Sequence, residues 1–100
     1  MKLVKHTSDN GNVVTIYIPE RFDFGLHGEF RKLYETEQNS KDVVLDMNKT
    51  QYMDSSALGM MLQLKEFTDS NNSKVSVANA NNNILQIMQI AHFDKSFTIK

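Results

Sequence analysis

Two kinds of apolar spacing alternate along this chain, and their alternation limits the possible folds more than any single motif does. Short runs of β-branched and aromatic residues indicate strands, whereas apolar residues spaced three and four apart indicate helices. The expected strands cover residues 3–7, 13–18, 42–46, 74–78 and 96–99. The expected helices follow Asp23, span 54–70 and carry the stripe at 84–91. Strand–helix–strand order requires right-handed crossovers between parallel strands, so we predict one α/β domain over residues 1–100.

The sheet of this domain is expected to be small and mixed, with flanking helices. Its first two strands are predicted to form an antiparallel hairpin, and Asn10-Gly11 between them is the dipeptide that type I′ turns favour. Pro19 ends the second strand because its nitrogen cannot donate to a ladder. The later strands join through βαβ units and are therefore expected to be parallel.

Packing within these units can also be predicted. Asp23 stands where it can cap the first helix, whose apolar stripe ends in the polar residues 35–40. The uninterrupted apolar run at 43–45 suits a strand that is covered on both faces. Residues 47–53, between that strand and the second helix, are predicted to form a loop.

The charge balance argues against two kinds of binding, and the absence of cysteine excludes two kinds of site. Eleven Lys and Arg against twelve Asp and Glu leave a net charge of −1, whereas binding to nucleic acid or to anionic lipid needs a dense positive surface. With no cysteine, a cysteine nucleophile and a thiolate zinc site are ruled out. The histidines at 6, 27 and 92 are scattered without metal-ligand spacing, so we expect neither a metal nor a cofactor.

The ends and apolar runs of the chain bear on its compartment. The first six residues turn polar too soon for a secretory signal. No apolar run approaches the roughly 18 residues that a membrane span requires. We therefore expect a cytoplasmic protein whose partners include neither a membrane nor nucleic acid.

Residues 52–59 carry the most functional information, with the sequence Tyr-Met-Asp-Ser-Ser-Ala-Leu-Gly. Asp54 is placed as the N-cap of the second helix, and Ser55 and Ser56 fall in its first turn. Free backbone N–H groups and the positive end of the helix dipole favour a phosphate there. Such a phosphate adds a charge of about −1.5 to −2 beside Asp54, which a partner built for a neutral hydroxyl would reject.

A simpler interpretation is that these residues only cap a helix, because Asp and Ser are favoured capping residues in any protein. Gly59 suggests more, since a glycine inside a helix costs roughly 1 kcal/mol relative to alanine. It indicates close approach by another backbone, either from within the domain or from a docking partner. Met61 is expected in the core, Met60 either in the core or at a contact surface, and Asp23 at a cap or at the rim of that surface.

In this setting, Asp-Ser-Ser-Ala-Leu-Gly at 54–59 after Val-Val-Leu-Asp at 43–46 resembles the signature of STAS domains, and specifically of bacterial anti-sigma factor antagonists. The resemblance extends over nearly the whole chain, from the N-terminal hairpin through Phe-Asp-Phe at 22–24 to the segment 84–97. Three departures lie at rims and loops: Ala57, the Pro-Glu-Arg at 19–21, and the missing glycine after the third helix. They bear on the identity of the partner more than on the fold.

The resemblance implies a small cytoplasmic regulator of transcription that has no catalysis of its own and works by partner switching. Ser55, directly after the motif aspartate, is then phosphorylated by a GHKL-type serine kinase that often doubles as an anti-sigma factor, with Ser56 as the second choice. A PPM-type phosphatase reverses the mark. The unphosphorylated form binds the kinase or anti-sigma factor and frees its other client. The predicted partner-binding residues are Asp23, Asp54, Ser55, Ser56, Ala57, Leu58, Gly59 and Met60.

Two other functions are compatible with these residues. A STAS subunit that regulates a transporter or another enzyme has the same fold and surface without phosphorylation. A serine hydrolase is the less favoured choice, because the Gly-x-Ser-x-Gly motif is absent. No histidine lies near the two serines in sequence, although folding can bring one close.

Overall fold

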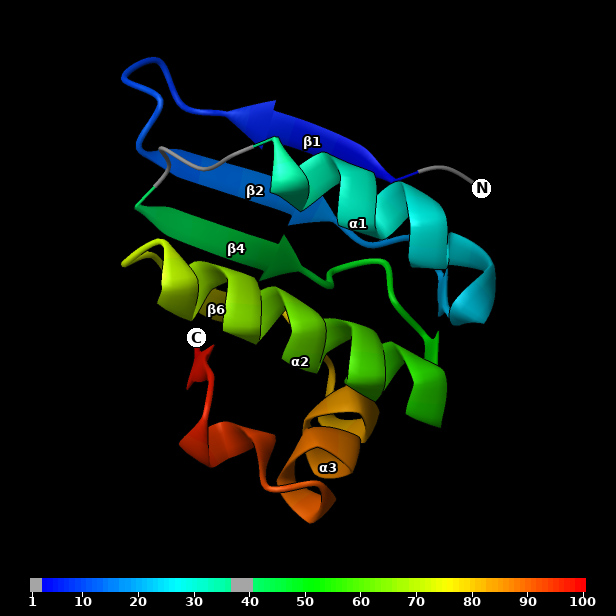
Figure 1. Cartoon of the computed structure of the whole chain (residues 1–100). Helices are drawn as coiled ribbons and strands as arrows, with labels where there is room; N and C mark the ends of the chain where they lie inside the picture. The colour runs from blue at the N-terminus through cyan, green and yellow to red at the C-terminus, as the bar shows by residue number, and fades with distance from the viewer. Residues whose placement is uncertain (1–2, 37–40) are drawn as a thin grey trace.

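The predicted mixed sheet is present in the computed structural model, which describes residues 3–36 and 41–100. Its order is β1-β2-β4-β6-β7 (Figure 1). The antiparallel pair is β1 (Val4–Thr7) and β2 (Val13–Tyr17), and the parallel strands that follow are β4 (Asp42–Asp46), β6 (Lys74–Ala78) and β7 (Thr98–Ile99). The helices are α1 (His27–Glu35), α2 (Ser55–Ser70) and α3 (Asn82–Ile90), with short 3₁₀ turns η1 (Phe24–Leu26) and η2 (Phe93–Lys95). The α/β prediction and the strand order along the chain are therefore confirmed.

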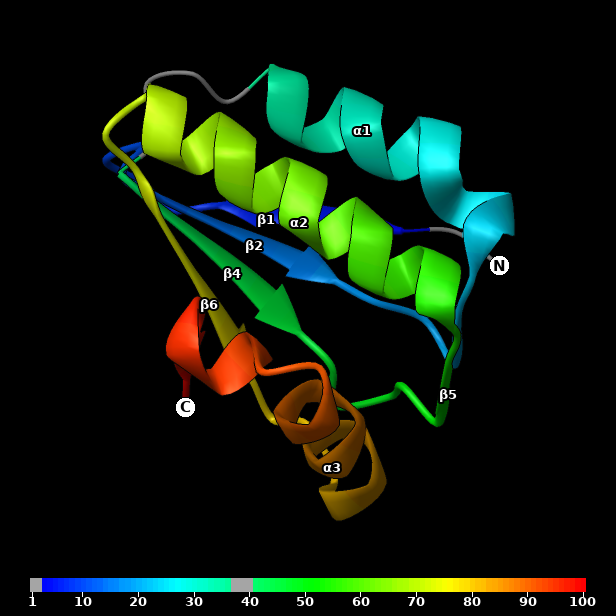
Figure 2. The same cartoon turned by 60° about the horizontal axis from the view of Figure 1, so that its bottom comes forward.

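Helices α1 and α2 lie side by side on one face of the sheet, and α3 lies beyond β6, at the opposite edge from β1 (Figures 1 and 2). Under the two helices, the central strands β2 and β4 bury alternate residues. One buried row crosses the sheet through Ile16, Leu45 and Val77. The neighbouring residue Val44 is only half-buried, because both long helices cover the same face. The expectation that strand 42–46 is covered on both faces is therefore wrong.

A chain of aromatic rings joins α1 to α2. Phe22 packs on Phe30 at 5.4 Å between ring centroids, Phe30 on Tyr34 at 5.5 Å, and Tyr34 on Phe67 at 5.1 Å. Such tilted and edge-on pairs add about 0.5–1.5 kcal/mol each beyond the area that they bury. The first pair joins β3 to α1, the second lies within α1, and the third, Tyr34 on Phe67, holds α1 against α2. The polar segment 35–40 that was expected to end the first helix lies partly outside the described residues.

The hairpin turn differs from the predicted type I′ turn. That turn needs a positive φ at both central residues, but here Gly11 has a φ of +75° and Asn10 has no positive φ. The N–H of Gly11 donates to the carbonyl of Ser8 at 2.9 Å. The Asn10 Oδ1 accepts hydrogen bonds from the Ser8 hydroxyl and from the N–H of Asn12. These side-chain bonds stabilise a longer turn in which glycine alone takes the left-handed conformation.

A second sheet has two strands, one of which lies in the segment 47–53 that was predicted to be a loop. Strand β3 (Arg21–Phe22) pairs in parallel with β5 (Tyr52–Met53). The N–H groups of Gln51 and Tyr52 donate to the carbonyl of Glu20 at 2.8 and 3.0 Å. Strands of two residues are too short to show a period, so hydrophobic alternation could not reveal this pair.

Thr50 ties the connection between β4 and β5 to two other parts of the domain. Its side chain is fully buried, and its hydroxyl lies 3.2 Å from the Ile18 carbonyl and 3.1 Å from the Pro19 carbonyl. The Asn81 amide donates to the Thr50 carbonyl at 3.1 Å, while the Asn81 Oδ1 caps α3 by accepting from the N–H of Ile84. One residue thus links the end of β2, the path to α2 and the start of α3.

Within residues 3–36 and 41–100, no helix combines the length and the apolar character needed to cross a bilayer.

We predict that Thr50→Val lowers the free energy of unfolding by about 1–3 kcal/mol, because it removes a buried donor and leaves two carbonyl groups without it. Urea denaturation measures the change. Thr98→Val, on an exposed position of β7, is the matched control and should stay within about 0.5 kcal/mol of the parent. Equal effects of the two substitutions would show that Thr50 does not hold this junction.

Candidate functional site

The start of α2 is positioned by the small β3–β5 sheet. Helix α2 begins at Ser55, directly after β5 and the single residue Asp54. The N–H of Asp54 reaches the carbonyl of Phe22 at 3.4 Å, which continues the pairing of β3 with β5. The first turn of the helix is therefore held beside β3 and the η1 turn that follows it, at one end of the domain (Figure 2).

Asp54 is the N-cap of α2, as predicted. It has an extended backbone, with φ −105° and ψ −178°, and its Oδ1 accepts the N–H of Ala57 at 3.0 Å. The same oxygen accepts the hydroxyl of Ser56 at 2.6 Å. The hydrogen bond from Ser56, supported by the backbone N–H of Ala57, holds the pKa of Asp54 below its ordinary value. Asp54 is therefore an anionic cap at neutral pH.

The two serines differ in their surroundings. Ser56 is half-buried and donates its hydroxyl to Asp54. Ser55 is exposed, and among the described residues its hydroxyl has no hydrogen-bond partner. Ser55 is thus the serine whose oxygen an enzyme can reach without breaking the helix cap, and it stands at the positive end of a 16-residue helix.

The four residues after the serines divide between core and surface. Ala57 and Met60 are 0% and 4% exposed, and their side chains hold α2 against the core. Leu58 is half-buried and Gly59 is exposed. Apart from its chain neighbours and the adjacent backbone of α2, a Cβ added at Gly59 would meet no described atom within 4 Å. Close packing inside the domain therefore does not explain this glycine, and approach by a docking partner stays a prediction.

Asp23 caps η1 rather than the α-helix itself. Its Oδ1 accepts the N–H of Gly25 at 3.0 Å, and its Oδ2 lies 3.5 Å from the Nε of Arg21. The guanidinium carbon of Arg21 in turn lies 4.4 Å from the centre of the Tyr52 ring. These contacts connect the exposed side chains of β3 and β5 next to the cap of α2.

Sequence reasoning missed the apolar side chains that surround this helix start. Phe24 is 64% exposed, and its ring stacks on His27 at 5.0 Å. Tyr52 precedes the cap by two residues, and Leu62 lies on the same face of α2 as Ser55 and Gly59; both are more than 40% exposed. The sequence shows that these residues are large and apolar, but only the structure shows that their side chains are exposed beside the helix start.

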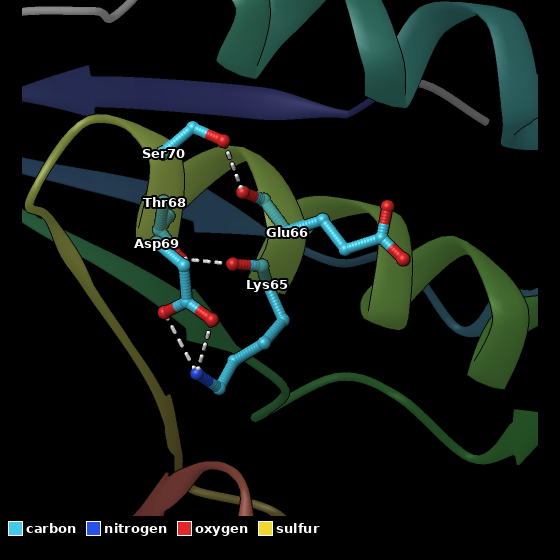
Figure 3. A network of polar contacts seen from close by, with 5 residues as sticks. All are labelled: Lys65, Glu66, Thr68, Asp69 and Ser70. Atoms are coloured by element: carbon cyan, nitrogen blue, oxygen red, sulfur yellow. Dashed lines mark hydrogen bonds and ion pairs between the residues drawn. The ribbon is translucent and has the colours of Figure 1, made fainter.

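At the other end of α2, the polar side chains form hydrogen bonds and an ion pair within the helix itself (Figure 3). The Lys65 ammonium lies 2.8 and 2.9 Å from the two carboxylate oxygens of Asp69. The hydroxyls of Thr68 and Ser70 donate to backbone carbonyls of the preceding turn, those of Lys65 and Glu66. This end of the helix differs from its start, because each hydroxyl among the residues drawn has a hydrogen-bond acceptor.

Comparison with known proteins identifies the family to which the chain belongs. A model of the STAS domain matches residues 5–100. A STAS-domain containing protein of Pseudomonas aeruginosa (strain UCBPP-PA14) is 37% identical over 100 residues, which is 99% of each chain. The chain belongs to the STAS domain family.

Solved structures agree with this fold. The anti-sigma factor antagonist SpoIIAA in its unphosphorylated form matches with a TM-score of 0.84 at 13% identity, over 99% of this chain and 88% of that one. The Bacillus cell fate determinant SpoIIAA in its phosphorylated form matches with a TM-score of 0.76 at 13% identity, over 99% and 91%. The fold of this domain is therefore that of anti-sigma factor antagonists.

We predict that Asp54→Asn reduces stability at neutral pH by about 0.3–1 kcal/mol, because it keeps an acceptor for the helix N–H groups but removes the charge that the dipole favours. Since the pKa of Asp54 is lowered in the folded state, the unfolded chain takes up the proton first, and this stabilisation is lost as the pH falls below about 4. Urea denaturation at several pH values should show parent and variant converging in acid.

Asp42→Asn removes one exposed carboxylate without affecting a helix cap and serves as the control for charge alone. A gap between parent and Asp54→Asn that stays constant down to low pH would contradict a charged cap.

Proposed function

We propose that this protein is a binding module switched by phosphorylation of Ser55, of the anti-sigma factor antagonist type. In its unphosphorylated form it binds a GHKL-type serine kinase that doubles as an anti-sigma factor, and phosphorylation releases it. A PPM-type phosphatase restores the binding form. The observation that carries this proposal is the exposed hydroxyl of Ser55 at the start of α2, which has no hydrogen-bond partner among the described residues. The adjacent Asp54 carboxylate already accepts hydrogen bonds from Ser56 and from the N–H of Ala57.

The position of Ser55 separates the effect of a phosphate on the domain from its effect on a partner. Within the domain, a phosphate at a helix N-terminus meets the positive end of the dipole, so modification is compatible with the fold. At an interface, the same group adds about −1.5 to −2 charge next to the anionic Asp54. A partner surface complementary to a neutral hydroxyl then faces charges that it cannot pair, which costs several kcal/mol.

Ser56 is the weaker choice of acceptor for a physical reason. Its hydroxyl donates to the Asp54 carboxylate at 2.6 Å, so a phosphate on that oxygen would replace a hydrogen bond by repulsion between two anions. The helix cap would be weakened at the same time. Asp54 thus supports the proposal in two ways: it caps the helix that presents Ser55, and it keeps Ser56 occupied.

The docking surface that we propose consists of the exposed side of the first two turns of α2, flanked by the capping aspartates Asp23 and Asp54. Ser55, Ser56, Leu58 and Gly59 contribute surface to it. Ala57 and Met60, which the sequence placed in the same set, act from beneath by seating the helix on the core. A partner approaches most closely at Gly59, where no side chain stands in the way.

We expect incubation with ATP and the cognate kinase to place one phosphate on Ser55. The Ser55→Ala variant should then lose phosphorylation and bind the kinase constitutively, whereas Ser56→Ala should still be phosphorylated. Ser55→Asp should imitate the released form. Mass spectrometry locates the phosphate and calorimetry measures binding; a phosphate found only elsewhere, or unimpaired binding by the phosphorylated form, would overturn the proposal.

We predict opposite effects of Gly59→Ala on stability and on binding. The substitution meets no steric obstacle within the domain and should raise the free energy of unfolding by about 1 kcal/mol through helix propensity. The added methyl group should weaken kinase binding by tenfold or more, roughly the effect of 1.4 kcal/mol, because it holds the partner away from α2.

Gly28→Ala is the matched control. Gly28 also lies in a helix with nothing within 4 Å of an added Cβ, but in α1, outside the proposed surface. It should stabilise the domain without changing affinity. If Gly59→Ala binds the kinase as tightly as Gly28→Ala does, no partner approaches at Gly59.

A further inference from the structure

A hollow of 860 Å³ lies away from the start of α2, where the carboxyl ends of β2 and β4 meet the segment after β6. Crevices at the carboxyl ends of parallel strands are the usual ligand sites of α/β sheets, and this volume lies in the range of small-ligand pockets. Its wall is apolar at Val4, Ile18 and Pro19. The other side chains that line the hollow are mainly acidic or carry an amide group.

Asp46, the last residue of β4, is the most constrained of these groups. Its Oδ1 accepts the backbone N–H of Asn48 at 2.9 Å, and its Oδ2 accepts the Asn79 amide at 3.1 Å. Asn79 is itself held in the left-handed conformation, with a φ of +61°. Both donors are neutral, and within the described parts of the chain Asp46 forms no ion pair. Since a carboxylate has about four acceptor positions, this half-buried anion is oriented but still able to accept more hydrogen bonds.

The rest of the lining adds one more anion, one cation and an aromatic ring. Glu20 brings a second carboxylate, which forms no ion pair with any described residue, and Lys49 brings the single ammonium group among the lining residues. Formal charge within the hollow is therefore −1. Tyr17, at the end of β2, is 42% exposed and also lines it. Two carboxylates and a tyrosine that line one hollow favour a planar cation as its ligand.

We propose that this hollow binds the guanidinium group of an arginine side chain carried by an extended peptide segment. A guanidinium donates two parallel hydrogen bonds to a carboxylate and stacks on an aromatic ring, and it loses less hydration than an ammonium does. The volume exceeds what the side chain needs, and the apolar wall can cover the flanking residues of the segment. This inference does not depend on phosphorylation of Ser55.

The test is an NMR shift titration of the intact protein with a capped Gly-Gly-Arg-Gly-Gly peptide. Saturable shifts should fall on the lining residues, at millimolar concentration or below. The same peptide with citrulline, which has the shape of arginine without its charge, should bind about tenfold more weakly or worse. The capped single amino acid, acetyl-arginine amide, should also be weaker; equal affinity would overturn the assignment to a peptide segment in favour of a small guanidinium compound.

Variants test which groups bind the cation. Asp46→Asn and Glu20→Gln should each weaken the arginine peptide about tenfold, whereas Lys49→Gln should tighten it by removing a like charge. Asp42→Asn, at the opposite end of β4, is the control and should leave affinity unchanged. The citrulline comparison uses the parent protein, so it remains decisive even if Asp46→Asn does not fold. Equal binding of citrulline and arginine, shifts elsewhere, or no saturable response would refute the proposal.

Discussion

The burial of one side of α2 is the constraint on which the rest of this domain depends. Ala57, Met61 and Leu64 are fully buried between this helix and the sheet, and the ring of Phe67 extends the contact to α1. Close-packed interiors tolerate few voids, so this stripe fixes the rotation of the helix about its axis. The same rotation turns Ser55 and Gly59 outward. The functional surface is thus a consequence of core packing and not a separate feature placed upon it.

The two ends of α2 are finished differently, and the difference matters for function. At its end, Lys65 pairs with Asp69, and the hydroxyls of Thr68 and Ser70 donate to carbonyls of the preceding turn. At its start, one carboxylate accepts both a helix N–H and a neighbouring hydroxyl. That arrangement directs the positive field of the helix at Ser55, whose hydroxyl forms no hydrogen bond with any residue that the structure describes. A small chemical change there alters the charge of the surface strongly.

The junction at Thr50 relates the two surfaces that we consider functional. The segment that carries Asn48 and Lys49 along the hollow continues through Thr50 to β5 and then to the cap of α2. Because Thr50 is fully buried and bonded to the end of β2, this segment is anchored midway between them.

The sequence by itself determined the features that depend on neighbours along the chain: the order of strands and helices, the buried stripes, and Asp54 as a helix cap. Helical and strand periods, and the short reach of a capping side chain, are local properties. Tertiary structure alone decided which face of β4 is covered, that β3 pairs with β5, which of two adjacent serines is exposed, and that no described side chain packs on Gly59. Each of these depends on segments that are distant in sequence and meet only when the sheet and helices pack, so no local pattern could reveal them.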